Sequence, residues 1–229
     1  MNRQQRLVLG GILVLGAIVL VRGGVVSEDT ALILAALIPS IILHEVSHGA
    51  VALAFGDDTA KQAGRLTLNP VAHVDPFGTL ILPAMLAIAS GGAAAFGYAK
   101  PVPVNPRRMR DPRNHGLLVS LAGPAVNIAL ALVAAAVFRS LDVNVFDPDR
   151  LTLFVYLFGT VNVVLAVFNL LPIPPLDGSA VVERVLPMRY WESYLRFRQY
   201  SMGLLLLVVF VFPLDRLFDP AIELWQRLL

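Results

Sequence analysis

Apolar runs of membrane-spanning length, separated by short polar segments, are the dominant pattern along this chain of 229 residues. A run of about 20 apolar residues is long enough to cross the hydrocarbon core of a bilayer as an α-helix. The pattern therefore predicts an all-α polytopic membrane protein with about five to six transmembrane helices, forming a single integral-membrane domain over residues 1–229. The predicted spans cover residues 7–21, 30–55, 117–138, 151–171 and 202–214, and a further apolar run covers 76–96.

The run at 76–96 is irregular, because it contains Pro83, Gly91 and Gly92. If it enters and leaves the bilayer on one side and the N-terminus is cytoplasmic, most Lys and Arg residues lie on the cytoplasmic side, as the positive-inside tendency requires. A full crossing inverts every later segment and places slightly more than half of these residues outside. We therefore expect a multi-pass protein of the cell membrane with a cytoplasmic N-terminus and a re-entrant hairpin or short β element beside a polar site.

The composition excludes a soluble globular domain. Hydrophobic residues make up 57% of the chain and charged residues 15%, and the mean hydropathy is +0.72. The formal net charge is only +2, and the basic residues lie in short segments between the spans, so we expect contact with the lipid bilayer and no nucleic-acid partner. The chain contains no cysteine, so any metal ion must be held by His, Asp or Glu.

The chemistry is concentrated in the apolar run at 30–55, which contains the motif HEVSH at 44–48. Residues four apart lie on one face of a helix, so His44 and His48 can bind the same metal ion, and Glu45 can then reach a metal-bound water. The alternative is a pair of buried histidines that are only hydrogen-bonded. We favour the metal site, because three ionisable groups inside a membrane span need a partner or a function to offset their desolvation.

A catalytic zinc site needs three protein ligands and an open position for water, so the two histidines require one more ligand. The candidates are His73, Asp75, His115 and Asp177. Asp177 is the strongest, because it follows three prolines whose broken backbone has to line a cavity. A turn or cap aspartate is the alternative, since Gly178 follows it. In the hairpin topology Asp177 and the histidines share one depth on the cytoplasmic side, which supports the assignment.

Several motifs besides HEVSH resemble the site-2 protease family of intramembrane zinc metalloproteases, in particular its compact bacterial and archaeal members without PDZ or CBS modules. The motifs are GRLTLNP at 64–70 followed by His73 and Asp75-Pro76, KPVPVNP at 100–106, GPAVN at 123–127 and FNLLPIPPLDG at 168–178.

The resemblance implies roles for individual residues of this chain. His44, His48 and Asp177 would hold one zinc ion per chain, and Glu45 would be the general base. Two asparagines, Asn127 and Asn169, would lie near the active site. There they either position the substrate or stabilise an oxyanion, or they only form hydrogen bonds between packed helices.

We therefore expect an intramembrane zinc endopeptidase that hydrolyses peptide bonds within or next to transmembrane segments, with its active site towards the cytoplasm. Its expected partners are the helix of a membrane-protein substrate and the bilayer. The alternatives are a membrane metal transporter, since buried His and Asp also mark ion pathways, and a catalytically inactive membrane scaffold. The role of Glu45 distinguishes the transporter from the protease, because transport needs no general base.

Three smaller expectations concern segments around this site. Residues 66–68 alternate like a short edge strand that could receive an extended substrate, with an ordinary loop as the alternative. The end of the chain, 219–229, alternates like an interfacial helix with Trp225 at headgroup level. The arginines within 107–113 are expected to contact acidic lipid headgroups.

Overall fold

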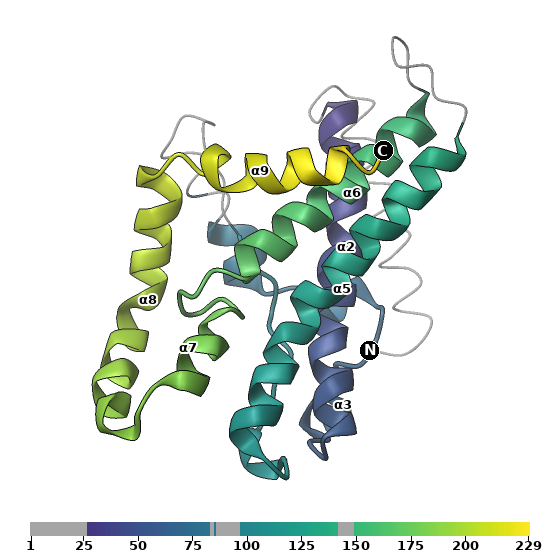
Figure 1. Ribbon diagram of the computed structural model, residues 1–229. Helices are drawn as coiled ribbons and strands as arrows, with labels where there is room; N and C mark the ends of the chain where they lie inside the picture. Colours follow the sequence, from purple (N-terminus) through teal and green to yellow (C-terminus); the bar gives the residue numbers. More distant parts are fainter. Residues whose placement is uncertain (1–26, 83–84, 86–96, 142–148) are drawn as a thin grey trace.

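The computed structural model of the protein describes residues 27–82, 85, 97–141 and 149–229 (Figure 1). Its regular elements are all helical, and no strand forms within these ranges. The elements are α2 (Glu28–Ala54), α3 (Thr59–Gln62), the 3₁₀ helix η1 (Pro70–His73), the π-helix η2 (Pro76–Ile81), the 3₁₀ helix η3 (Pro106–Arg108), α5 (Pro112–Ser140), α6 (Arg150–Asn169), α7 (Ser179–Val185), the 3₁₀ helix η4 (Met188–Tyr190), α8 (Trp191–Val211) and α9 (Asp215–Gln226).

Four helices in the described part of the chain are long and apolar enough to cross a membrane. These candidate spans are Glu28–Ala54, Pro112–Ser140, Arg150–Asn169 and Met188–Val211. They agree with the prediction of a helical, polytopic membrane protein. The predicted span at 7–21 lies outside the described residues, and so does the run at 76–96 apart from 76–82 and 85.

The helices α2, α5 and α6 pack together at the centre of the fold (Figure 1). Each begins at a side-chain cap, because Ser27, Asp111 and Asp149 accept the backbone N–H three positions further on. Small side chains between α5 and α6 let the two backbones approach closely. The buried residues of this core are Ala131, Ala134 and Ala135 of α5, Val155 and Val163 of α6, and Trp225 of α9.

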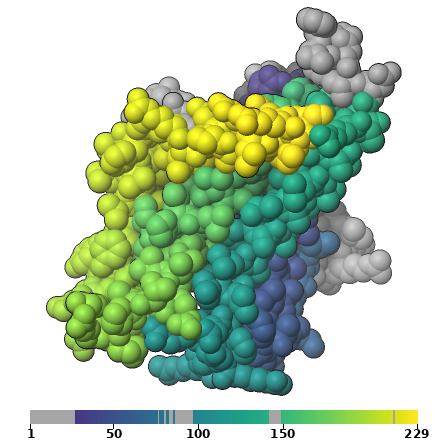
Figure 2. Space-filling view, in the orientation of Figure 1, coloured from purple at the N-terminus to yellow at the C-terminus, as the bar shows by residue number. Residues whose placement is uncertain are grey.

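Trp225, which we expect at headgroup level on an interfacial helix, is part of this core, and its ring faces the protein. Its indole Nε1–H donates to the Ala131 carbonyl oxygen at 2.9 Å, and its ring lies against Tyr156. Position 159 makes room for the indole, since a Cβ on Gly159 would lie 2.0 Å from the Trp225 ring. The helix α9 therefore crosses one end of the bundle, as Figure 2 shows, with a buried indole holding it there.

The helix α8 begins earlier than the span predicted at 202–214. The apolar run starts at Met202, whereas the helix starts at Trp191. Arg198 lies on the additional turns, where its Nη1 is 3.1 Å from Glu183 Oε1 of α7. Arginine is a good helix former, so a charged residue at this exposed position does not interrupt the helix. The pattern of apolar positions alone therefore placed the start of α8 too late.

The edge strand expected at 66–68 does not form, and these residues make a bend and loop instead. Local hydrogen bonds of Thr67 hold this loop. The Thr67 carbonyl oxygen is 2.8 Å from His73 Nε2, and the Thr67 hydroxyl accepts the Asn69 N–H at 3.2 Å. The alternating pattern was too short to outweigh these local hydrogen bonds.

Truncating the indole that holds α9 should destabilise the fold. We expect Trp225→Ala to lower the free energy of unfolding by about 3 kcal/mol, because it leaves a large cavity between α9 and the bundle. Thermal unfolding in detergent, followed by circular dichroism, measures the change. Leu224→Ala, at an exposed position of the same helix, is the matched control and should have a much smaller effect. Equal effects of the two substitutions would contradict the assignment.

Candidate metal centre

His44 and His48 lie one turn apart on the face of α2 that meets α5. Both are almost fully buried, with relative exposures of 7% and 8%. Their rings meet edge to face with centroids 4.7 Å apart, as the helical period predicts for residues four apart. The approach of α5 depends on Gly123, since a Cβ there would lie 2.4 Å from His44 Cε1.

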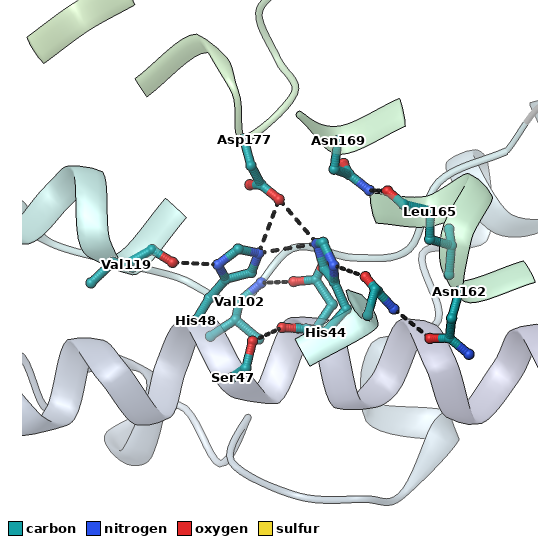
Figure 3. A network of polar contacts seen from close by, with 11 residues as sticks. His44, Ser47, His48, Val102, Val119, Asn162, Leu165, Asn169 and Asp177 are labelled. Atoms are coloured by element: carbon teal, nitrogen blue, oxygen red, sulfur yellow. Dashed lines mark hydrogen bonds and ion pairs between the residues drawn. The ribbon is translucent and has the colours of Figure 1, made fainter. Parts of the chain in front are cut away.

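Asp177 reaches the two histidines from the loop after α6 (Figure 3). Its Oδ2 lies 3.0 Å from His44 Nε2 and 3.3 Å from His48 Nε2, and the two Nε2 atoms lie 3.1 Å apart. The next residue holds this loop in place, because the Gly178 N–H donates to the Asn169 carbonyl oxygen at 2.7 Å. Only glycine fits at 178, where a Cβ would lie 2.2 Å from a backbone carbonyl oxygen.

Hydrogen bonds on the far side of each ring determine which nitrogen faces Asp177. His44 Nδ1 lies 2.6 Å from Asn127 Oδ1, and His48 Nδ1 lies 2.7 Å from the Val119 carbonyl oxygen. Both partners are acceptors, so each Nδ1 donates its proton to them, and in the neutral ring Nε2 then presents a lone pair. Two imidazole lone pairs therefore face a buried carboxylate oxygen that accepts no hydrogen bond from the described residues.

The donor set and its spacing fit a zinc ion. A tetrahedral ion with bonds of about 2.0–2.1 Å to His and Asp separates its ligand atoms by about 3.3 Å. The three separations here are 3.0, 3.1 and 3.3 Å. Acceptor atoms this close repel one another unless a cation lies between them, and three protein ligands leave a fourth position for water. His44, His48 and Asp177 can therefore hold zinc in a site of the catalytic type.

The other candidate ligands lie elsewhere. His73 is hydrogen-bonded within its own loop, Asp75 caps η2, and the ring of His115 stacks on Phe55 with centroids 4.0 Å apart. Among the residues that the structure describes, Asp177 is the candidate that joins the two histidines.

Glu45 lies beside this cluster, in the wall of a cavity of about 860 Å³ that the histidines, Asp177 and Asn169 also line. Its Oε2 accepts the backbone N–H of Val102 at 2.9 Å. Residues from 97–106, which include the KPVPVNP motif, therefore cover one side of the cavity. Side chains of α5, α6, α7 and α8 complete the walls.

Asp57, just beyond α2, holds the far end of this covering segment. It is fully buried, and its carboxylate accepts the Asn105 N–H at 2.5 Å, the Thr59 N–H at 3.0 Å and the Thr59 hydroxyl. Burial alone would raise the pKa of Asp57, but these hydrogen bonds and the nearby Arg108 outweigh it and hold the pKa below its usual value. The carboxylate is therefore charged at neutral pH and keeps the segment attached to α2.

Asn127 is fully buried and uses its amide inside the protein. Its Oδ1 faces His44, and its Nδ2 donates to Asn162 Oδ1 at 2.8 Å. Asn162 donates to Ser40 Oγ at 2.8 Å, and Ser40 donates to the Ala36 carbonyl oxygen at 2.7 Å. Sequence reasoning missed Asn162 and Ser40, because a single polar residue in an apolar run carries no sign of its partner.

Asn169, the other predicted asparagine, lies at the end of α6. It lines the cavity, and its Nδ2 donates to the Leu165 carbonyl oxygen at 3.0 Å. The structure thus places the two asparagines differently, with Asn169 at the cavity wall and Asn127 behind a histidine.

Comparison with known proteins gives the class of this chain. The family described as Peptidase family M50 matches residues 32–147 and 144–212. "Putative zinc metalloprotease YwhC" of Bacillus subtilis is 40% identical over 185 residues, which are 78% of this chain and 79% of that protein. "Putative zinc metalloprotease Rip2" of Mycobacterium tuberculosis is 38% identical over 184 residues, which are 80% of this chain and 67% of that protein. No solved structure matches.

The chain belongs to peptidase family M50, the site-2 protease family that its motifs resemble. It is a zinc metalloprotease, and the predictions of the family, of the enzyme class and of zinc as the cofactor are confirmed.

Removing the amide behind His44 should weaken metal binding. We expect Asn127→Leu to lower the zinc affinity about 10–100-fold, because the ring loses the acceptor that fixes its tautomer and orientation. Competition with a chelator on the detergent-purified chain measures this without any substrate.

Asn127→Asp keeps an acceptor facing His44 and should retain most of the affinity. Thr160→Val is the control, because that hydroxyl lies on α6 and donates to Tyr156 of the same helix. Parent-like affinity in Asn127→Leu would contradict the role of this amide.

Proposed function

We propose that the chain is an intramembrane zinc endopeptidase that cleaves peptide bonds within or next to transmembrane segments of membrane-protein substrates. The observation that carries the proposal is the convergence of His44, His48 and Asp177 between candidate membrane-spanning helices, with Glu45 beside them at a cavity. In this proposal the first three residues hold one zinc ion, and Glu45 is the general base. Membership of family M50 supports the reaction class.

Bound zinc supplies two effects, since it polarises the scissile carbonyl and lowers the pKa of a bound water towards about 7. Glu45 takes the proton of the attacking water and then delivers it to the leaving amine, which requires hydrogen-bond reach to both groups. Because Glu45 follows His44 directly in α2, one rigid helix positions both a ligand and the base.

The two asparagines have different roles in the proposal. Asn169 lines the cavity, and its amide has a second N–H beside the one that it donates to Leu165, so we assign it to contact with the substrate backbone. Asn127 is buried behind His44 and orients that ring.

The proposal includes the orientation in the cell membrane, with a cytoplasmic N-terminus, a re-entrant run at 76–96 and the active site towards the cytoplasm. The distribution of Lys and Arg residues supports this orientation. The cavity is also bordered by Arg113, Arg184 and Arg198, which suit the basic, cytoplasmic side and give water a polar route to the site.

Zinc content tests the ligand set. We expect one zinc per chain in the purified parent and in Glu45→Gln, and loss of zinc in Asp177→Ala, because two histidines alone leave the site one ligand short. Elemental analysis of detergent-purified protein measures the ratio. Full zinc content in Asp177→Ala would exclude Asp177 as the third ligand.

Cleavage tests the reaction. The test substrate is a single-span protein with helix-weakening residues in its membrane segment, placed with the chain in liposomes, and mass spectrometry locates the cut. We expect the parent to cut within or beside the span, and Glu45→Gln to reduce the rate at least about 100-fold, because it removes the general base.

Glu28→Gln is the matched control, since Glu28 lies exposed at the start of the same helix and pairs with Arg150. It should cleave like the parent. Zinc binding without cleavage of a panel of such substrates would favour the inactive scaffold, and zinc flux that survives Glu45→Gln would favour the transporter.

A further inference from the structure

Arg65, in the GRLTLNP motif, is a buried cation without an acidic partner among the described residues. It is only 7% exposed, and no ion pair includes it in that part of the chain. Its Nη1 donates to the Ala72 carbonyl oxygen, and its Nη2 donates to the carbonyl oxygens of Lys100 at 2.6 Å and Pro101 at 3.1 Å. A buried charge is costly when no opposite charge is near, so its retention here requires an explanation.

The Pro101–Val102 peptide group connects Arg65 to Glu45. Its carbonyl oxygen accepts from Arg65 Nη2, and its N–H donates to Glu45 Oε2 at 2.9 Å. In a trans peptide group the C=O and N–H point in opposite directions, so the group lies between the guanidinium and the carboxylate. Ordinary peptide dimensions then place the two charged groups within about 8 Å of each other.

The charges at the two ends strengthen both hydrogen bonds of this peptide group. The guanidinium polarises the carbonyl, and a polarised peptide group is a better N–H donor to the carboxylate. The dipole of the peptide group is thus aligned between a buried cation and the carboxylate of the proposed base. A neutral side chain at position 65 would lose this alignment even if it filled the same space.

The prolines on either side of Val102 restrict the position of its N–H. Pro101 and Pro103 have no N–H and restrict the backbone, so Val102 supplies the donor of this stretch. The Val102 side chain is 7% exposed and packs against α2 one turn beyond Glu45, where a Cβ on Gly49 would lie 3.0 Å from Val102 Cγ1. The peptide group is therefore held by its side chain, its carbonyl oxygen and its N–H together.

We propose that Arg65 is a positioning residue for Glu45 and acts through the Pro101–Val102 peptide group. The inference rests on the proposed function, because it is Glu45 as general base that Arg65 positions. If Arg65 only tied two loops together, the direction of the Val102 N–H would not depend on the charge at position 65.

The first experiment follows hydrogen exchange of the zinc-loaded full chain in detergent, with residue resolution by fragmentation in the mass spectrometer. Within 100–105 the backbone N–H groups belong to Lys100, Val102, Val104 and Asn105, so individual sites are easily separated. We expect Arg65→Gln to speed exchange at Val102 at least tenfold and to leave Asn105, which Asp57 holds, unchanged. Arg107→Gln, which removes an exposed arginine nearby, is the matched control.

The second experiment measures cleavage of the single-span test substrate in liposomes. We expect Arg65→Gln to keep one zinc per chain and a parent-like KM, and to lower kcat about 10–100-fold, because the base is no longer held in place. Arg65→Lys should recover part of kcat, since an ammonium group can still donate to the Pro101 carbonyl oxygen.

A third variant leaves Arg65 unchanged. Replacing Val102 by the corresponding α-hydroxy acid deletes its N–H and weakens the Pro101 carbonyl oxygen as an acceptor, with the same side chain. It should lower kcat as Arg65→Gln does, again with zinc retained.

Parent-like exchange at Val102 together with parent-like kcat in Arg65→Gln would overturn the proposal. Loss of zinc or a lower melting temperature in parallel with kcat would also overturn it, because Arg65 would then support the fold and not the base. If the parent itself does not cleave, the proposed function fails, and the exchange experiment still decides whether Arg65 holds the Val102 N–H on Glu45.

Discussion

The rest of the structure depends on one constraint, which is that three acceptor atoms meet among apolar helices. His44 Nε2, His48 Nε2 and Asp177 Oδ2 lie within 3.3 Å of one another. Lone pairs at this distance repel one another, and a cation bound between them would remove that repulsion. The surrounding backbone has to come close enough to keep this arrangement, and glycine at positions 123 and 178 permits that approach.

The same constraint couples the packing of the helices to the orientation of the His44 ring. The amide behind His44 belongs to Asn127 of α5, its partner Asn162 belongs to α6, and Ser40 returns the hydrogen bonds to α2. Lipid offers no alternative hydrogen-bond partner, so each of these buried groups is satisfied only when the three helices are in register. Any shift of one helix along another would leave a polar group unpaired and turn the proposed ligand His44 away from the site.

The sequence predicted the features that depend on neighbouring residues. It did not predict the contacts between residues that are far apart in the chain. The motif at 44–48 is local, because helical period alone brings its ends together, and the broken backbone before Asp177 indicates a cavity by its own chemistry. Asn162 and Ser40 are 122 positions apart, and no local pattern relates them. The amphipathic pattern of 219–229 did not reveal that the Trp225 ring packs on the protein, because Gly159, which makes room for the ring, lies on another helix.

The proposed metal site and the proposed base are held by different parts of the chain, so metal binding and hydrolysis would depend on different contacts. The proposed ligands are positioned by side chains and by helices packed in register. Glu45 is positioned instead by the backbone N–H of Val102, which lies between two prolines. Arg65 and Asp57 hold the two ends of this segment. Helix α2 brings Glu45 to the cavity, but a helix fixes only the start of a long side chain. In the proposed mechanism a correctly assembled metal site is therefore not sufficient for hydrolysis, because the Glu45 carboxylate also has to be held where the water will be.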